Sequence, residues 1–151
     1  MAGRSAPSDA TMILNKKERE ELRMKFGGKC AYCGCELPVR GWHADHIKPV
    51  NREMKVARDK QDRTIIVPTG KLYSPENDHI DNLFPSCAPC NIDKHSFPLE
   101  IWRKKIEDKS SVCRRNYSAF RHAERFKLVM VLDRPLFFWF ETYKKKKFGI
   151  P

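Results

Sequence analysis

Two Cys-x-x-Cys pairs constrain this chain of 151 residues more than any other feature of its sequence. The pairs are Cys30-Ala-Tyr-Cys33 and Cys87-Ala-Pro-Cys90, and each places two thiols on one tight turn. Two such turns complete the tetrahedral set of four thiolates that zinc prefers, whereas a single pair would be ambiguous between metal binding and redox chemistry. The spacing therefore predicts a structural zinc site held by all four cysteines.

The 53 residues between Cys33 and Cys87 must contain a folded unit, because one zinc ion closes both ends of that segment. Cys35 and Cys113 belong to neither pair. We expect both to be buried as small hydrophobic residues, with Cys35 as the alternative to Cys33 in the ligand set.

The charge of the chain predicts a polyanionic partner. It carries 30 Lys and Arg against 19 Asp and Glu, a net charge of +11, of which +8 falls in residues 99–151. Nucleic acid is the first candidate, an anionic membrane surface is the second, and a purely solubilising charge is the third. We expect specific chemistry in the N-terminal part and electrostatic attraction in the C-terminal third.

No stretch of the sequence predicts a membrane span, since the longest apolar runs are 128–132 and 136–140. Residues 1–11 lack the apolar stretch of a secretory signal and are predicted to be a disordered tail. A cytoplasmic location follows, where cysteines bind metal more often than they form disulfides. We expect no membrane partner and no small-molecule substrate.

Local patterns predict the main elements. Asn15 and Glu18 form a capping-box pattern that starts a short helix, and Gly27-Gly28 end it. Leu99, Trp102 and Ile106 recur at helical spacing and predict a core-facing stripe. Other elements are strands over 39–47 and 64–70, a helix over about 117–127, and over 128–143 either a hairpin or a strand plus helix.

Polar residues follow the cysteines in a recognisable order. Asp45-His46 lies in "DHIKP", Asn82 precedes a leucine, Asn91 directly follows Cys90, and Lys94 comes three residues later. The order C-x-x-C, DHI-x-P, NL, C-x-x-CN-x-x-K, over about residues 26–94, resembles the HNH endonucleases of the His-Me finger (ββα-metal) superfamily. The third letter of the motif is here Asn91 rather than His, a variant that the family also contains.

The resemblance implies an α+β fold, with a zinc-braced ββα-metal core and additional flanking helices. Residues 12–151 would form a single nuclease domain, with a core over about 26–110 and a basic C-terminal extension over 111–151. The implied activity is metal-dependent hydrolysis of phosphodiester bonds in DNA, with RNA as the alternative substrate. A compact chain of this kind suits a phage or a mobile element.

The resemblance also implies residue roles. His46 would be the general base, and Asp45 and Asn91 would hold a catalytic Mg²⁺ or Mn²⁺. Asn82 would pin the loop of the hairpin and orient His46, and Lys94 would contact a phosphate. The basic helices after Leu99 would follow the DNA backbone, with the candidates Arg103, Lys104, Arg114 and Arg115.

Several alternatives stay open. A second DHI tripeptide, with Asp78 and His79, is assigned to a loop, and His43 and His95 are candidate supporting histidines. The chain from His46 to Asn82 is longer than the family's hairpin, so 51–78 is an insertion that acts as a lid, a substrate-selecting element or a surface loop. The competing functions are a non-catalytic zinc-knuckle module that binds nucleic acid and a structural zinc protein.

Overall fold

The computed structural model describes residues 12–148, and the side chains of residues 12–143. The disordered tail predicted for residues 1–11 lies outside this range. Helices and antiparallel strand pairs both occur, so the fold class is α+β as predicted. None of the helices described here is both long and apolar enough to cross a membrane.

Helix α1 (Lys16–Met24) begins at the predicted capping box. The Asn15 side chain accepts from the Glu18 backbone N–H at 3.0 Å, and the Glu18 carboxylate accepts from the Asn15 N–H at 2.9 Å. The helix ends before Gly27 and Gly28, which both have positive φ, a conformation that glycine adopts without steric cost. The helix predicted from the capping box is therefore confirmed.

Strand β1 (His43–His46) pairs antiparallel with β4 (Leu83–Ser86), His43 opposite Ser86 and His46 opposite Leu83. Helix α2 (Ala88–Lys94) follows β4 directly. Strand β1 is shorter than the predicted 39–47, because the chain bends just before it at Gly41, with a φ of 88°. The result is two antiparallel strands followed by a helix.

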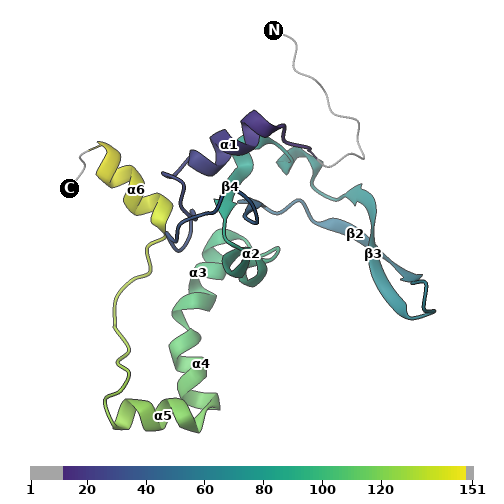
Figure 1. Ribbon diagram of the computed structural model, residues 1–151. Coiled ribbons are helices and arrows are strands. Elements are labelled where there is room, and N and C mark those ends of the chain that lie inside the picture. The colour runs from purple at the N-terminus through teal and green to yellow at the C-terminus, as the bar shows by residue number, and fades with distance from the viewer. Residues whose placement is uncertain (1–11, 149–151) are drawn as a thin grey trace.

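A second strand pair lies between β1 and β4 in the sequence. It consists of β2 (Arg52–Arg58) and β3 (Thr64–Leu72), which includes the predicted strand over 64–70. The 3₁₀ turns η1 (Pro75–Asn77) and η2 (Ile80–Asn82) then lead back to β4. Figure 1 shows this β2–β3 ribbon projecting away from the central body.

Four helices form the C-terminal half: α3 (Leu99–Glu107), α4 (Lys109–Asn116), α5 (Ser118–Arg125) and α6 (Trp139–Phe148). In Figure 1, α3 and α4 form a second arm with α5 at its far end, and a long segment returns to the central body at α6. The helices predicted from Leu99 and over 117–127 are confirmed. Residues 128–138, all described, form no strand, so the strand in both options for 128–143 is wrong.

The core is aromatic and joins distant parts of the chain. Trp102 lies against Tyr32 with ring centroids 4.9 Å apart and stacks on Phe138 at 5.2 Å. Such pairs contribute about 0.5–1.5 kcal/mol each beyond their buried area. The Phe140 N–H donates to the Ala31 carbonyl at 2.8 Å, so part of the segment expected as a basic extension completes the core.

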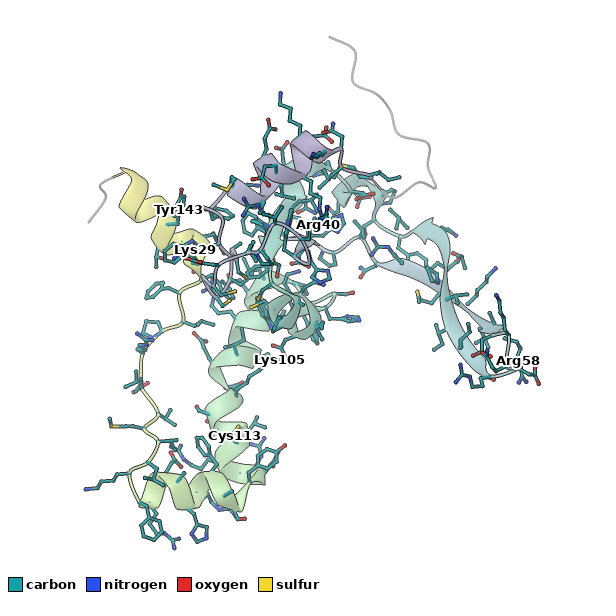
Figure 2. The ribbon with its side chains drawn as sticks, viewed as in Figure 1. Lys29, Arg40, Arg58, Lys105, Cys113 and Tyr143 are labelled. Carbon is teal, nitrogen blue, oxygen red and sulfur yellow. The ribbon has the colours of Figure 1, made fainter. Side chains whose placement is uncertain are left out.

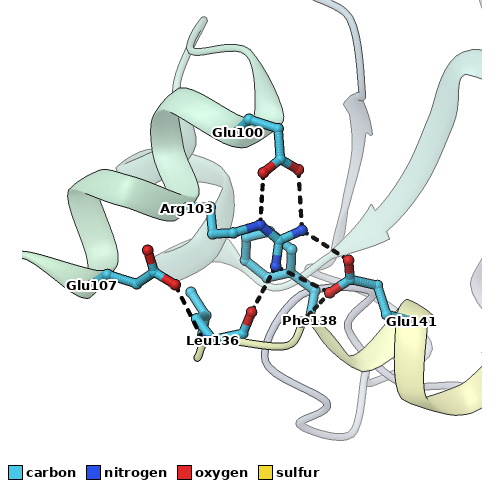
Figure 3. Close-up of polar contacts among 6 residues, drawn as sticks. All are labelled: Glu100, Arg103, Glu107, Leu136, Phe138 and Glu141. Carbon is cyan, nitrogen blue, oxygen red and sulfur yellow. Dashed lines mark hydrogen bonds and ion pairs between the residues drawn. The ribbon is translucent and has the colours of Figure 1, made fainter. Parts of the chain in front are cut away.

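Arg103 fastens the returning segment to α3 (Figure 3). Its guanidinium donates to Glu100 at 2.9 Å, to Glu141 at 2.8 Å and to the Leu136 carbonyl at 2.7 Å, and it lies 4.4 Å from the centre of the Phe138 ring. The two glutamates raise its pKa further. These contacts with protein groups occupy its donors, and the predicted contact of Arg103 with DNA stays a prediction.

Candidate functional site

The two Cys-x-x-Cys turns meet in one cluster. The Sγ atoms of Cys30, Cys33, Cys35 and Cys87 all lie within 4.8 Å of one another, and those of Cys33 and Cys87 are 3.7 Å apart. This group of four contains Cys35 in the place where the sequence predicted Cys90. Four cysteines at these separations can hold a metal ion such as zinc.

The thiols influence one another's ionisation. The hydrogen bond with Cys90 lowers the pKa of Cys30 to about 4, and that same contact raises the pKa of Cys90. Partial desolvation by the surrounding thiols, with contacts to Cys33, raises the pKa of Cys35 to about 12. The cluster thus favours the deprotonation of one cysteine, while the neighbouring cysteines show resistance to the loss of a second proton. A bound divalent cation removes that resistance, because coordinating thiols are deprotonated.

Cys35 and Cys113 depart from their prediction in different ways. Cys35 is exposed and lies inside the thiol cluster, so its description as a buried hydrophobic residue is wrong. Cys113 lies on α4, which Figure 2 shows well away from the central body. Five thiols therefore gather around a site that takes four.

A cavity of about 670 Å³ lies between β1, α2 and the inserted segment. Asp45 and His46 reach it from β1, and Asn91 and His95 reach it from α2 and its C-cap. Asp78 joins them from the end of the insertion. The cavity thus brings together three of the predicted catalytic residues and one carboxylate that was not predicted.

His46 and Asp78 form a largely buried pair. The Nε2 atom of His46 lies 2.8 Å from Oδ1 of Asp78, and the other oxygen of Asp78 accepts from the Met12 N–H at 2.7 Å. When a neutral histidine donates through Nε2, its Nδ1 is left as an acceptor. The one sequence signal for Asp78 was the repeated DHI tripeptide.

Asp45 is buried and held on one side. Its Oδ2 accepts from the Tyr32 hydroxyl and lies 2.9 Å from Nζ of Lys94. Burial, with the charge of Asp45, raises the pKa of Tyr32, which keeps that hydroxyl protonated as a donor. No hydrogen bond to Oδ1 occurs within the described part of the chain, so this oxygen is available to a ligand.

Lys94 has no exposed surface and also donates to the His46 carbonyl at 2.7 Å. The prediction that Lys94 contacts a phosphate is wrong, because its ammonium faces inward and fastens α2 to β1. Arg114 is exposed but donates to Glu124 at 2.9 Å, while Lys104 and Arg115 are exposed on the same arm. The role of these three in DNA binding stays a prediction.

Asn82 pins the chain where it leaves β1. Its Oδ1 accepts from the Lys48 N–H at 3.0 Å, and its Nδ2 donates to the carbonyls of Lys48 and Asn77, both at 2.8 Å. These contacts match the loop-pinning geometry predicted for Asn82. His79 and His43 are exposed and do not line the cavity.

Comparisons with protein-family models, with curated proteins and with solved structures found no match to this chain. The geometry defines the class: an α+β protein in which a thiol cluster able to hold metal adjoins a polar cavity. That cavity presents carboxylate, imidazole and carboxamide groups.

Proposed function

We propose that this protein is a metal-dependent endonuclease of the HNH type that hydrolyses phosphodiester bonds in DNA. The observation that carries the proposal is the single cavity that gathers Asp45, His46 and Asn91. The antiparallel pair β1–β4 followed by α2 supports it, since this is the order of elements in a ββα-metal core.

A structural zinc would be held by Cys30, Cys33, Cys87 and Cys90. The first two lie in the turn that precedes β1, and the last two lie at the start of α2. Zinc would therefore join the two elements that carry the catalytic residues. Cys35 would be the surplus thiol: it lies within the cluster, but Cys90 completes the Cys-x-x-Cys pair that Cys87 opens.

His46 would take the proton of the attacking water through Nδ1, since Asp78 occupies Nε2. The Asp78 carboxylate would hold the ring in this tautomer and stabilise the imidazolium that forms, as the carboxylate of a catalytic triad does. Asn82 would keep the Lys48 loop, and with it the end of β1, in place.

The donors on the cavity wall fit a hard divalent cation. Asp45 offers Oδ1, and the Asn91 side chain has no hydrogen-bond partner among the described residues, so its amide oxygen is also available. A bound Mg²⁺ or Mn²⁺ would neutralise charge on the phosphate and on the leaving oxygen. Tyr32 and Lys94 would fix the Asp45 carboxylate through its other oxygen.

A plasmid-nicking assay with Mg²⁺ or Mn²⁺ tests the proposal. His46→Ala is expected to lose about 10²–10⁴-fold in rate, the usual contribution of a general base. His79→Ala is the matched control, because it removes the exposed histidine of the second DHI tripeptide and should retain activity. Zinc content and circular dichroism of both variants check that the fold is kept. Equal activity of the wild type and His46→Ala would contradict the proposal.

One observation favours a second function, a zinc-knuckle module that binds nucleic acid without cleaving it. The Lys94 ammonium lies 2.9 Å from Asp45 and reduces the negative charge that a catalytic cation would meet. A binding titration at several salt concentrations complements the nicking assay. Salt-sensitive DNA binding, with no nicking by the wild type in Mg²⁺ or Mn²⁺, would establish this module and reject the nuclease.

A further inference from the structure

The β2–β3 ribbon leaves an apolar face uncovered. Met54, Val56 and Ile66 are 51%, 71% and 68% exposed. An isolated two-stranded ribbon is only marginally stable in water, and exposed apolar patches commonly mark a binding surface. The proposed catalytic residues of the cavity do not account for this face.

Strand register places these side chains together. Met54 is opposite Pro68, and Val56 is opposite Ile66. Alternate residues of a strand share a face, so Arg58 lies at the outer end of the same stripe, whereas an irregularity in the register separates Arg52 from Met54 at the inner end. We call this surface the Val56 face.

The opposite face of the ribbon differs. It carries Ile65 and Val67, which are half-buried, and the exposed Lys55. Each face thus carries one valine and one isoleucine. Val56 and Ile66 are exposed on one face, and Val67 and Ile65 are half-buried on the other.

The charge of the ribbon favours a polyanion. Residues 52–72 contain six basic and three acidic residues. Arg58, Arg63 and Lys71 are in ion pairs with those acids. The three remaining cations make no ion pair among the described residues: Arg52, Lys55 and Lys60.

The Val56 face continues the wall of the catalytic cavity. Arg52 and Met54 line the cavity that holds Asp45 and His46. At about 3.3 Å per residue, the six steps from Arg52 to Arg58 span about 20 Å. That length matches about six base-pair steps of about 3.4 Å. Figure 2 shows Arg58 at the far end of the ribbon, so the ribbon extends outward from the proposed cleavage site.

We propose that the β2–β3 ribbon enters the major groove of duplex DNA beside the cleaved phosphate, with the Val56 face toward the base edges. The choice of DNA rests on the proposed function. A major groove about 12 Å wide admits a two-stranded ribbon, and apolar side chains contact the thymine methyl group there. Basic residues beside this face, Arg52 among them, contact phosphates. The deep, narrow major groove of duplex RNA excludes such a ribbon.

Binding of short duplexes to otherwise intact, zinc-loaded protein tests the ribbon, in a His46→Ala background without added Mg²⁺ or Mn²⁺ so that the DNA stays whole. The first variant, Val56→Ser with Ile66→Ser, alters the exposed face. The matched control, Ile65→Ser with Val67→Ser, alters the opposite face. We expect the first to weaken duplex DNA binding about tenfold or more, and the control to change it less than threefold. Binding to duplex RNA of the same sequence should be equally weak for all three proteins.

A charge test needs no change in the apolar face. Arg52→Gln is expected to reduce the slope of log affinity against log salt by about one, because one phosphate contact is lost. Arg63→Gln is the control, since Arg63 already pairs with Asp59 at 2.7 Å. Unchanged slopes in both variants would count against the phosphate contact. Circular dichroism shows whether each protein keeps its fold.

The outcomes separate this inference from the proposed function. Face-dependent duplex binding by a protein that never nicks DNA supports the ribbon and rejects the nuclease. Nicking by the wild type, with equal duplex binding by both double variants, rejects the ribbon and keeps the nuclease. Face-dependent binding to duplex RNA alone overturns the assignment to DNA.

Discussion

Replacing Lys94 with methionine tests the buried link between α2 and β1. Its Nζ lies 2.9 Å from the Asp45 carboxylate and has no exposed surface. At an effective dielectric constant of about 20, attraction at this separation is about 6 kcal/mol. Desolvation opposes it by several kcal/mol per ion. Lys94→Met removes the attraction but leaves the carboxylate desolvated, so the free energy of unfolding should fall by about 3–5 kcal/mol.

Urea denaturation of the zinc-loaded protein at 25 °C measures this loss. A double variant, Lys94→Met with Asp45→Asn, should recover part of the stability, because a neutral carboxamide costs less to bury than an unpaired carboxylate. Lys104→Met is the control, since Lys104 is an exposed lysine on α3 without an ion pair among the described residues. Its unfolding free energy should change by less than about 0.5 kcal/mol.

Two results would refute the buried pair. One is a loss below about 1 kcal/mol in Lys94→Met. The other is a double variant, Lys94→Met with Asp45→Asn, that is no more stable than Lys94→Met. This comparison still applies if Lys94→Met alone fails to fold. A drop of about one in the salt slope of DNA binding, with stability unchanged, would instead restore Lys94 as a phosphate contact.

Three further predictions concern other parts of the molecule. Arg103→Ala should lower the free energy of unfolding by about 2 kcal/mol, as expected for charge-assisted hydrogen bonds, and leave DNA affinity unchanged in a binding titration. Hydrogen bonds from Lys109, then Trp102, lower the pKa of Asp93 from its ordinary 3.8 to about 2, so its stabilisation holds above pH 4 and is lost as the pH falls through 2. The stability gap between wild type and Asp93→Asn should therefore narrow from pH 4 to pH 2, and a constant gap would contradict this. Cys35→Ser should keep one zinc per chain by metal analysis whereas Cys90→Ser should lose it, and the reverse would exchange their assignments.

Local patterns in the sequence predicted the elements that depend on local contacts. The Asn15–Glu18 capping box and the Leu99–Trp102–Ile106 stripe need only neighbours within one or two helical turns. The meeting of the Cys-x-x-Cys turns was also predictable, because one tetrahedral ion requires four ligands and therefore both turns.

The contacts that residues make with distant partners were not predicted from the sequence. Lys94 was predicted to contact a phosphate, since nothing near it in sequence shows that Asp45, 49 positions earlier, lies beside it. Arg103 read as one cation of a basic helix, whereas Glu141 and Phe138 reach it from the returning segment. Such contacts follow from the path of the chain, which periodicity does not specify.

The two DHI tripeptides belong to one site rather than two. The insertion is closed at its base, where the Tyr73 N–H donates to the Asn51 carbonyl at 2.8 Å and the Ser74 N–H to that of Val50 at 3.1 Å. A closed base brings the chain back beside the end of β1, so Asp78 of the second tripeptide meets His46 of the first. The base of the insertion therefore serves the site, while the outer ribbon is free to contact a partner. Shortening β2 and β3 together beyond that base should leave the His46–Asp78 pair in place, so nicking of a plasmid at saturating protein should survive while duplex affinity falls.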